Sequence, residues 1–121
     1  MKSDATRNNH VDYIEFQAKS ADELVAAKQF YGSVFGWIYK DWGSDYADTQ
    51  SSGLGTGISV DRTNQPQHPL VVIYAESLET SRANVIAAKG EITKDIFAFP
   101  GGRRFHFLDP AGNELAVWSE V

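Results

Sequence analysis

The chain has 121 residues, 42% of them hydrophobic, which suits one domain with an apolar core of its own. It contains no cysteine, which excludes disulfides, zinc–thiolate sites, iron–sulfur clusters and cysteine nucleophiles and fits a cytoplasmic protein. The formal net charge of −5 argues against nucleic acid as a partner, since proteins that bind phosphate backbones present a basic face, and it favours small molecules or other proteins.

Residues 1–9 are polar, and no apolar stretch follows them. We expect a flexible tail here, because a polar terminal segment has little to bury. Neither a signal peptide nor a membrane span is indicated, since both need a longer apolar run. The rest of the chain, 10–121, is expected to form a single domain with halves of about 10–62 and 69–121.

The first half begins with β-forming residues over His10–Phe16, which predict a strand. Ser20 and Glu23 form a capping-box pattern, in which a serine caps a helix and a glutamate three residues later returns to its start. Apolar residues at spacings of three and four predict a helix, which Gly36 ends. Glycines and serines separate three further predicted strands: Trp37–Asp41, Asp45–Thr49 and Leu54–Val60.

The second half repeats this order of elements. Leu70–Ala75 is an apolar run typical of a buried strand. Ser77 is placed to cap a second helix, and Gly90 is predicted to close it. Glycine- and proline-containing turns separate three more predicted strands, near Ile92–Asp95, Arg103–Leu108 and Glu114–Ser119.

Two pairs of segments align between the halves. Gly36–Asp41 shares four of six residues with Gly90–Asp95, and Gly53–Ser59 aligns with Gly112–Trp118 at a slightly larger offset. Together with the matching order of helices and strands, this indicates an internal duplication. We therefore predict an α+β fold of two βαβββ modules, whose mixed, curled sheets surround one cleft.

The sequence resembles the vicinal oxygen chelate superfamily, which contains glyoxalase I, bleomycin-resistance proteins and extradiol dioxygenases. The resemblance is carried by FYGSVFGW at 30–37, at the end of the first predicted helix, and by FPGGRRFHFLDPAGNELAVW at 99–118. It implies that each half curls into an incomplete barrel and that the cleft holds either a divalent metal or a bound drug. It also implies a homodimer, because such proteins commonly complete their clefts across two subunits.

Family enzymes bind the metal through side chains of the first and last strands of each half. These positions map by resemblance onto Tyr13, Gly57, Leu70 and Ala116. None of the four is a histidine, aspartate or glutamate, which are the donors that a divalent ion prefers. We therefore expect no metal at the usual site and no cofactor. The predicted ligand-binding cleft is lined by Tyr13, Glu15, Gly57, Ser59, Leu70, Val72, Ala116 and Trp118.

A relocated metal or a metal-free acid–base pair is the alternative. Side chains on a strand alternate faces, so Glu15 should point the same way as Tyr13, and Glu114 the same way as Ala116. With His106 on a neighbouring strand, these carboxylates form the candidate catalytic or metal-binding set. The competing interpretation leaves Glu114 in an exposed turn, pairs Glu15 with an arginine and packs His106 on an outer face. His10 and His68 are both expected to be solvent-exposed.

Aromatic residues are spread over most of the predicted strands, and many of them belong to an ordinary core. An apolar cleft with few polar groups suits a flat or hydrophobic ligand. Glu15 and Glu114 at its edge favour a cationic ligand, whereas Arg103 or Arg104, if either points inward, favours an anion.

Three functional hypotheses follow. The first is a metal-independent small-molecule-binding protein, similar to the drug-sequestering branch that confers antibiotic resistance. The second is an enzyme, namely a glyoxalase-type lyase, an isomerase or a dioxygenase, acting through Glu15, His106 and Glu114. The third is a structural dimerisation module, with the cleft filled by its own aromatic side chains.

Overall fold

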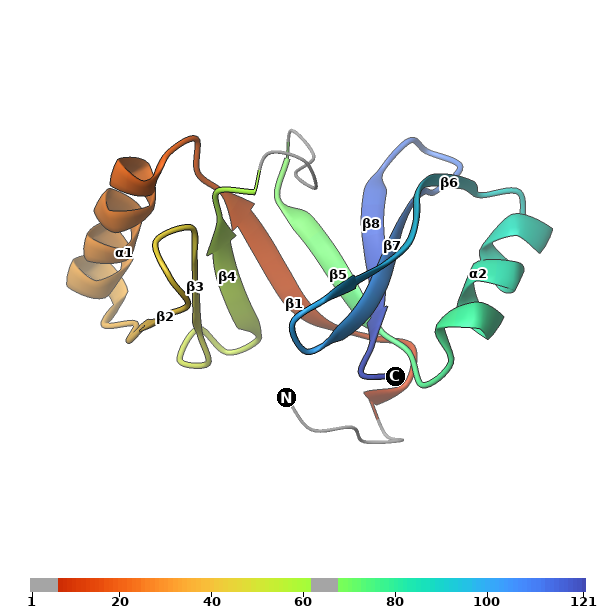
Figure 1. Cartoon of the computed structure of the whole chain (residues 1–121), viewed down its shortest axis with the longest axis horizontal. Coiled ribbons are helices and arrows are strands. Elements are labelled where there is room, and N and C mark those ends of the chain that lie inside the picture. The colour runs from red at the N-terminus through yellow and green to blue at the C-terminus, as the bar shows by residue number, and fades with distance from the viewer. Residues whose placement is uncertain (1–6, 62–67) are drawn as a thin grey trace. The chain divides into compact units, whose positions relative to one another are not determined.

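The computed structural model describes residues 7–61 and 68–121. In these residues eight strands and two helices follow one another in the order β1-α1-β2-β3-β4-β5-α2-β6-β7-β8 (Figure 1). This confirms the predicted α+β class with two βαβββ modules. The chain divides into two units: an N-terminal unit, Tyr13–Leu70, and a C-terminal unit, which joins the residues up to Asp12 with Val71–Val121. Residues 1–6 of the predicted tail lie outside the described residues.

The N-terminal unit contains β1 (His10–Gln17, from Tyr13 on), α1 (Ala21–Phe35), β2 (Lys40–Asp41), β3 (Tyr46–Thr49) and β4 (Gly55–Ser59). Its strands are ordered β2-β3-β4-β1, with β4 parallel to β1 and the other neighbours antiparallel. In the parallel pair Glu15 lies opposite Gly57. The mixed sheet that the repeat predicts is therefore present in this unit.

The start and end of α1 follow the capping pattern of the sequence. The Ser20 hydroxyl accepts a hydrogen bond from the Glu23 amide, and the Glu23 carboxylate accepts one from the Lys19 amide. Gly36 ends the helix in the left-handed region, with φ of 74°. Leu24 of the helix packs with strand residues on one face of the sheet, in a core that includes Ala18, Ala47 and Ile58.

The C-terminal unit contains β5 (Leu70–Tyr74, from Val71 on), α2 (Leu78–Ala87), β6 (Glu91–Phe99), β7 (Gly102–Leu108) and β8 (Glu114–Ser119). Its strands are ordered β5-β8-β7-β6, and β8 is parallel to β5. Val72 lies opposite Ala116, just as Glu15 lies opposite Gly57 in the first unit. The two halves thus share the order of their strands and one register at the aligned positions, as the internal repeat predicts.

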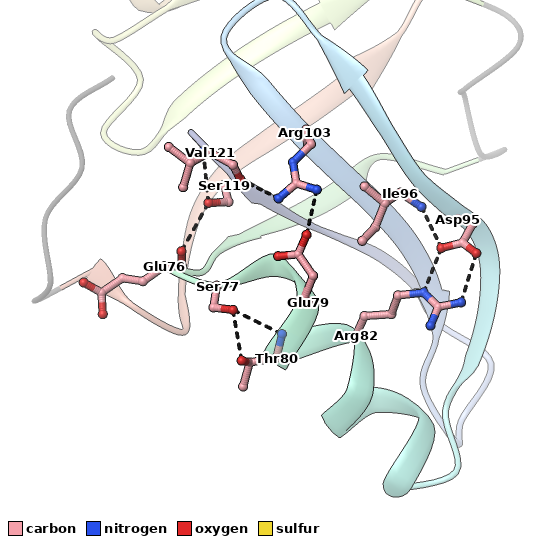
Figure 2. Close-up of polar contacts among 10 residues, drawn as sticks. All are labelled: Glu76, Ser77, Glu79, Thr80, Arg82, Asp95, Ile96, Arg103, Ser119 and Val121. Carbon is pink, nitrogen blue, oxygen red and sulfur yellow. Dashed lines mark hydrogen bonds and ion pairs between the residues drawn. The ribbon is translucent and has the colours of Figure 1, made fainter.

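Polar contacts hold α2 against its sheet (Figure 2). Arg82 donates from Nε and Nη2 to the two carboxylate oxygens of Asp95, at 2.7 and 2.9 Å. Arg103 of β7 donates to Glu79 at 2.8 Å, so the N-terminal half of the helix is tied to both β6 and β7. Beneath these contacts the buried core of the unit contains Ala75, Leu78, Phe105 and Val117. Within the described residues, neither helix has the length and apolar character that crossing a bilayer requires.

The predicted strand Trp37–Asp41 is wrong in its first three residues, because β2 comprises only Lys40–Asp41. The Trp37 ring stacks on Tyr31 of α1 at 5.1 Å between centroids instead of entering the sheet. The Ile38 amide donates to the Ser51 hydroxyl rather than to a neighbouring strand. Aromatic packing on the helix therefore overrides the β-propensity of this segment.

The prediction that Gly90 closes α2 is also wrong. The helix is capped at Ala88, and Lys89 takes the left-handed conformation, with φ of 70°. Gly90 instead donates from its amide to the Val85 carbonyl, and a Cβ at this position would lie 2.7 Å from Val85 Cγ1. A glycine is needed here for space rather than for its backbone angle.

Candidate functional site

On the face of the N-terminal sheet that points away from α1, polar side chains converge over Gly57. This hydroxyl cluster comprises Tyr13, Glu15, Tyr46 and Gly57. The hydroxyls of Tyr13 and Tyr46 form a hydrogen bond with each other, and Tyr46 donates to Glu15 Oε2 at 3.2 Å. Glu15 is only 5% exposed, so its carboxylate is held by partners inside the protein. Tyr13 and Glu15 share a face, as strand alternation predicts.

Gly57 leaves the space that the two tyrosines occupy. A Cβ at position 57 would collide with both hydroxyl oxygens. Burial raises the pKa of Tyr46 far above its ordinary value, and the nearby Glu15 charge raises it further, so the phenol stays neutral. A neutral phenol is a poor ligand for a divalent ion, and neither Leu70 nor Ala116 offers a side-chain donor. The residues at the four mapped positions therefore do not fit the metal that the resemblance implies.

Elsewhere in residues 7–61 and 68–121, no three histidine, aspartate or glutamate side chains gather closely enough to hold a metal ion. Of the predicted set, the structure brings His106 and Glu114 together within the C-terminal unit. Glu15 belongs to the hydroxyl cluster of the other unit, where Tyr46 donates to it.

The buried imidazole of His106 is paired with the partly exposed carboxylate of Glu114. His106 Nδ1 lies 3.3 Å from Glu114 Oε2, and the Thr93 hydroxyl donates to the same oxygen at 3.2 Å. His106 is 1% exposed and lies opposite Ala116, on the face of the sheet that points away from α2. Because a carboxylate at Nδ1 orients the ring, the pair has the geometry of an acid–base group.

The same face carries an aromatic surface, which comprises Tyr74, Phe97, Phe99, Arg104 and Trp118 and which we call the aromatic face. The Arg104 guanidinium lies 5.4 Å from the Phe97 ring centre and 5.7 Å from that of Phe99. Trp118 packs against Phe99 at 6.3 Å and against Tyr74 at 5.2 Å. Phe97 and Phe99 remain partly exposed. Flat apolar rings and a cation thus lie together on one surface.

Arg7 and Asp12 complete one end of this face, and the sequence analysis did not identify them as site residues. Arg7 donates to Asp12 at 2.6 Å, and its guanidinium lies 4.2 Å from the Tyr74 ring centre. Asp12 also accepts from the Trp118 indole at 3.1 Å. Burial raises the pKa of Asp12, and the bonds from Trp118 and Arg7 oppose this shift. The one sequence signal for the Arg7–Asp12 pair is a carboxylate, that of Asp12, inside the predicted strand of residues 10–16.

The two neighbouring arginines of β7 point to opposite faces. Arg103 is bound to Glu79 of α2 and to the Val121 carbonyl, whereas Arg104 lies on the aromatic face. Strand alternation separates adjacent side chains in this way, but it does not say which of the two faces the helix.

The remaining predicted residues also have definite places. Val72, Ala116 and Trp118 are buried in the C-terminal unit, on the sheet face opposite the α2 core. Leu70 is buried at the start of β5, and Ser59 is buried in β4, where its hydroxyl accepts from the Asp61 amide. His10 and His68 are exposed, as predicted. The single cleft that these residues were expected to line stays a prediction.

The sequence matches no known protein family and no curated protein. Solved structures do match. A Legionella pneumophila protein named as an NAD-dependent benzaldehyde dehydrogenase aligns over 88% of this chain and 96% of its own, with a TM-score of 0.72 and 13% identity. A glyoxalase/bleomycin resistance protein/dioxygenase superfamily member from Vibrio splendidus aligns over the same shares of the two chains, with a TM-score of 0.65 and 10% identity.

The chain has the glyoxalase/bleomycin resistance/dioxygenase fold. The Mn(II)-bound glyoxalase from Novosphingobium aromaticivorans has the same fold, with a TM-score of 0.67 and 23% identity over 95% of this chain. The present chain spans 40% of that protein. At these identities the likeness establishes the architecture of the glyoxalase-type fold, and activity has to be argued from the side chains.

Proposed function

We propose that this protein binds an aromatic small molecule on the aromatic face, without a divalent metal at the four mapped positions. The observation that carries the proposal is the arrangement of partly exposed Phe97 and Phe99 around the Arg104 guanidinium, with Trp118 beside them. Such a surface binds flat ligands by stacking and apolar contact, while a few polar groups set their orientation. Sequestration of an aromatic antibiotic is one form that this function takes.

Metal independence is supported by the chemistry of the mapped residues. Glycine, leucine and alanine supply no side-chain donor, and the hydrogen-bonded Tyr13 and Tyr46 side chains fill the space above Gly57. The expected result of elemental analysis, on protein purified without chelator, is less than stoichiometric manganese, iron, nickel or zinc. A stoichiometric metal that is lost on Glu15→Gln or Glu114→Gln substitution would contradict this part of the proposal.

Ligand binding is tested by thermal shift with neutral, anionic and cationic planar aromatics and with aromatic antibiotics. We expect stabilisation by at least one class, and its loss in Phe97→Ala and Phe99→Ala. Ile86→Ala is the control, because Ile86 is 48% exposed on α2, which covers the opposite face of the sheet. Equal ligand-induced thermal shifts in all three variants, or no thermal shift with any compound, would overturn the proposal. The hypothesis of a structural dimerisation module would then be favoured.

A second candidate function is acid–base catalysis, which the His106–Glu114 contact favours. In this case His106 exchanges a proton with a substrate, and Glu114 positions the ring through Nδ1. The expected signature is incorporation of solvent deuterium into a panel of aldehydes, ketones and thioesters. Glu114→Gln should abolish it, whereas Thr93→Val should reduce it only slightly. No incorporation by the wild-type protein would exclude this function for the compounds tested.

We also propose a cytoplasmic homodimer. The cytoplasm is supported by the absence of cysteine from the sequence. Self-association is supported by exposed apolar side chains on and after α1, since Phe30, Phe35 and Ile38 are 58%, 59% and 80% exposed. Sedimentation velocity at micromolar concentration should give a dimer, and Phe35→Ser should weaken it. A wild-type monomer would contradict the proposal.

A further inference from the structure

The contacts of Arg7 have the composition of a binding site for an organic cation. A guanidinium lies 4.2 Å from the centre of the Tyr74 ring and is paired at 2.6 Å with the Asp12 carboxylate. A ring face together with a carboxylate is the combination that binds planar cations in proteins. Here the bound cation is a side chain of the protein itself.

The receiving groups are held in place independently of Arg7. Asp12 accepts from the Trp118 indole at 3.1 Å, and Trp118 packs edge-on against Tyr74. The Asn9 amide donates to the Tyr74 carbonyl at 2.8 Å, which fixes the backbone between Arg7 and Asp12. Replacing Arg7 therefore leaves the carboxylate and the ring in position, because their other contacts remain.

The position of this group connects it to the proposed ligand surface. Tyr74 and Trp118 belong to the aromatic face, and Trp118 packs against Phe99. A cationic ligand on this face would find the Arg7 guanidinium already paired with Asp12 and lying over the Tyr74 ring. Arg7 is 23% exposed and Asp12 11%, so the side chain that must move is the more accessible one.

We propose that the protein takes a planar organic cation, such as an amidinium or guanidinium, which replaces Arg7 on Tyr74 and Asp12. Arg7 then acts as an internal competitor that sets the affinity. This inference rests on the proposed function, because it uses the same face. It specifies a positive charge on the part of the ligand at Asp12, whereas Arg104 favours a neutral or anionic part beside Phe97 and Phe99. Only non-covalent exchange is involved.

Benzamidine is the probe, and benzamide is its neutral near-isostere. The readout is the set of indole N–H resonances of the three tryptophans, with Trp118 assigned from Trp118→Phe. In Arg7→Ala, benzamidine should bind about tenfold more tightly than in the wild type, which corresponds to loss of one ion-paired competitor. The double variant Arg7→Ala/Asp12→Asn should lose this gain. Arg82→Ala, which removes another ion-paired arginine, should show none.

Unchanged benzamidine affinity in folded Arg7→Ala, or an equal gain for benzamide, would overturn the inference. If the Arg7→Ala variant does not fold, the inference is tested on the wild-type protein by its resonance shifts. Benzamidine should shift the Arg7 Nε–H and Trp118 indole resonances together, and a shift of neither is the contrary result. Failure of the proposed function is distinguishable, because then neutral and charged aromatics alike give no Phe97-dependent thermal shift.

Discussion

Gly57 shows how one missing side chain determines the chemistry around it. The position corresponds to Ala116 of the second half, yet the two surroundings differ completely. Two phenol hydroxyls lie above Gly57, whereas Ala116 faces His106 across β7 and β8. The repeat therefore preserves the backbone while the side chains have diverged, and each unit has its own set of polar groups.

The first prediction concerns this glycine. Gly57→Ala should lower the free energy of unfolding by about 2 kcal/mol, because the methyl group collides with the Tyr13 and Tyr46 hydroxyls. Urea unfolding measures the change. In a Tyr13→Phe/Tyr46→Phe background the same substitution should cost clearly less. Gly32→Ala is the control: a Cβ there lies 3.4 Å from the Trp37 carbonyl oxygen, which is ordinary van der Waals contact, and we expect no loss of stability.

A second prediction concerns alkaline pH. Burial and the Glu15 charge raise the pKa of Tyr46, so folding favours its protonated form. This contribution to stability is complete below the ordinary tyrosine pKa of about 10 and is lost as the pH rises above it. Tyr46→Phe should therefore flatten the loss of stability between pH 10 and pH 11. Phenolate absorbance of the folded protein at pH 11 should be the same with and without Tyr46, and a lower absorbance in the variant would refute this.

At the scale of the elements, α1 depends on its first turn. The Ser20 hydroxyl accepts from the Glu23 amide, which would otherwise lack a partner within the helix. Ser20→Ala should reduce the free energy of unfolding by about 1 kcal/mol. Ser33→Ala, at an exposed position near the other end of the same helix, should change it by less than about 0.5 kcal/mol. Equal effects of the two substitutions in urea unfolding would show that the cap does not stabilise α1.

The turn between β7 and β8 supplies a prediction at acid pH. The Asn113 side chain, followed by the amides of Asn113, Ala111 and Gly112, lowers the pKa of Asp109. A lowered pKa contributes stability above the unfolded value of about 4, and the contribution is lost as the pH falls below it. Asp109→Ala should therefore be less stable than the wild type at pH 7 and equally stable at pH 2. An equal difference at both pH values would contradict this cause.

Local patterns in the sequence predict most of the elements. The capping box over Ser20–Glu23, the left-handed Gly36 and the limits of β8 are all determined by nearby residues, and the structure confirms them. The wrong predictions occur where tertiary packing, rather than neighbouring residues in the sequence, determines the local conformation. Trp37 leaves the sheet for the rings of α1, and Gly90 is needed because Val85 leaves no room for a Cβ. Neither packing contact can be predicted from the local sequence.

At the scale of the whole molecule, the repeat allows a prediction of topology but not of the full set of side chains in the site. The aligned positions place Glu15 opposite Gly57 and Val72 opposite Ala116, so that the mapped residues are found in matching registers. The His106–Glu114 contact follows from strand pairing. The contact between Arg7 and the Tyr74 ring does not follow from strand pairing, because nothing in a polar terminal segment indicates which aromatic ring its arginine will contact.

The segment around Arg7 has a consequence for the order of folding events. The bond between Asp12 and Trp118 joins residues 106 positions apart, and that between Asn8 and Glu76 joins residues 68 apart. Closing such long loops is entropically costly, so these contacts form after the hairpin of β7 and β8. Asp12 and Tyr74, which the proposed cation needs, therefore come together late in folding. Cation binding would then report on the completed C-terminal unit rather than on its hairpin.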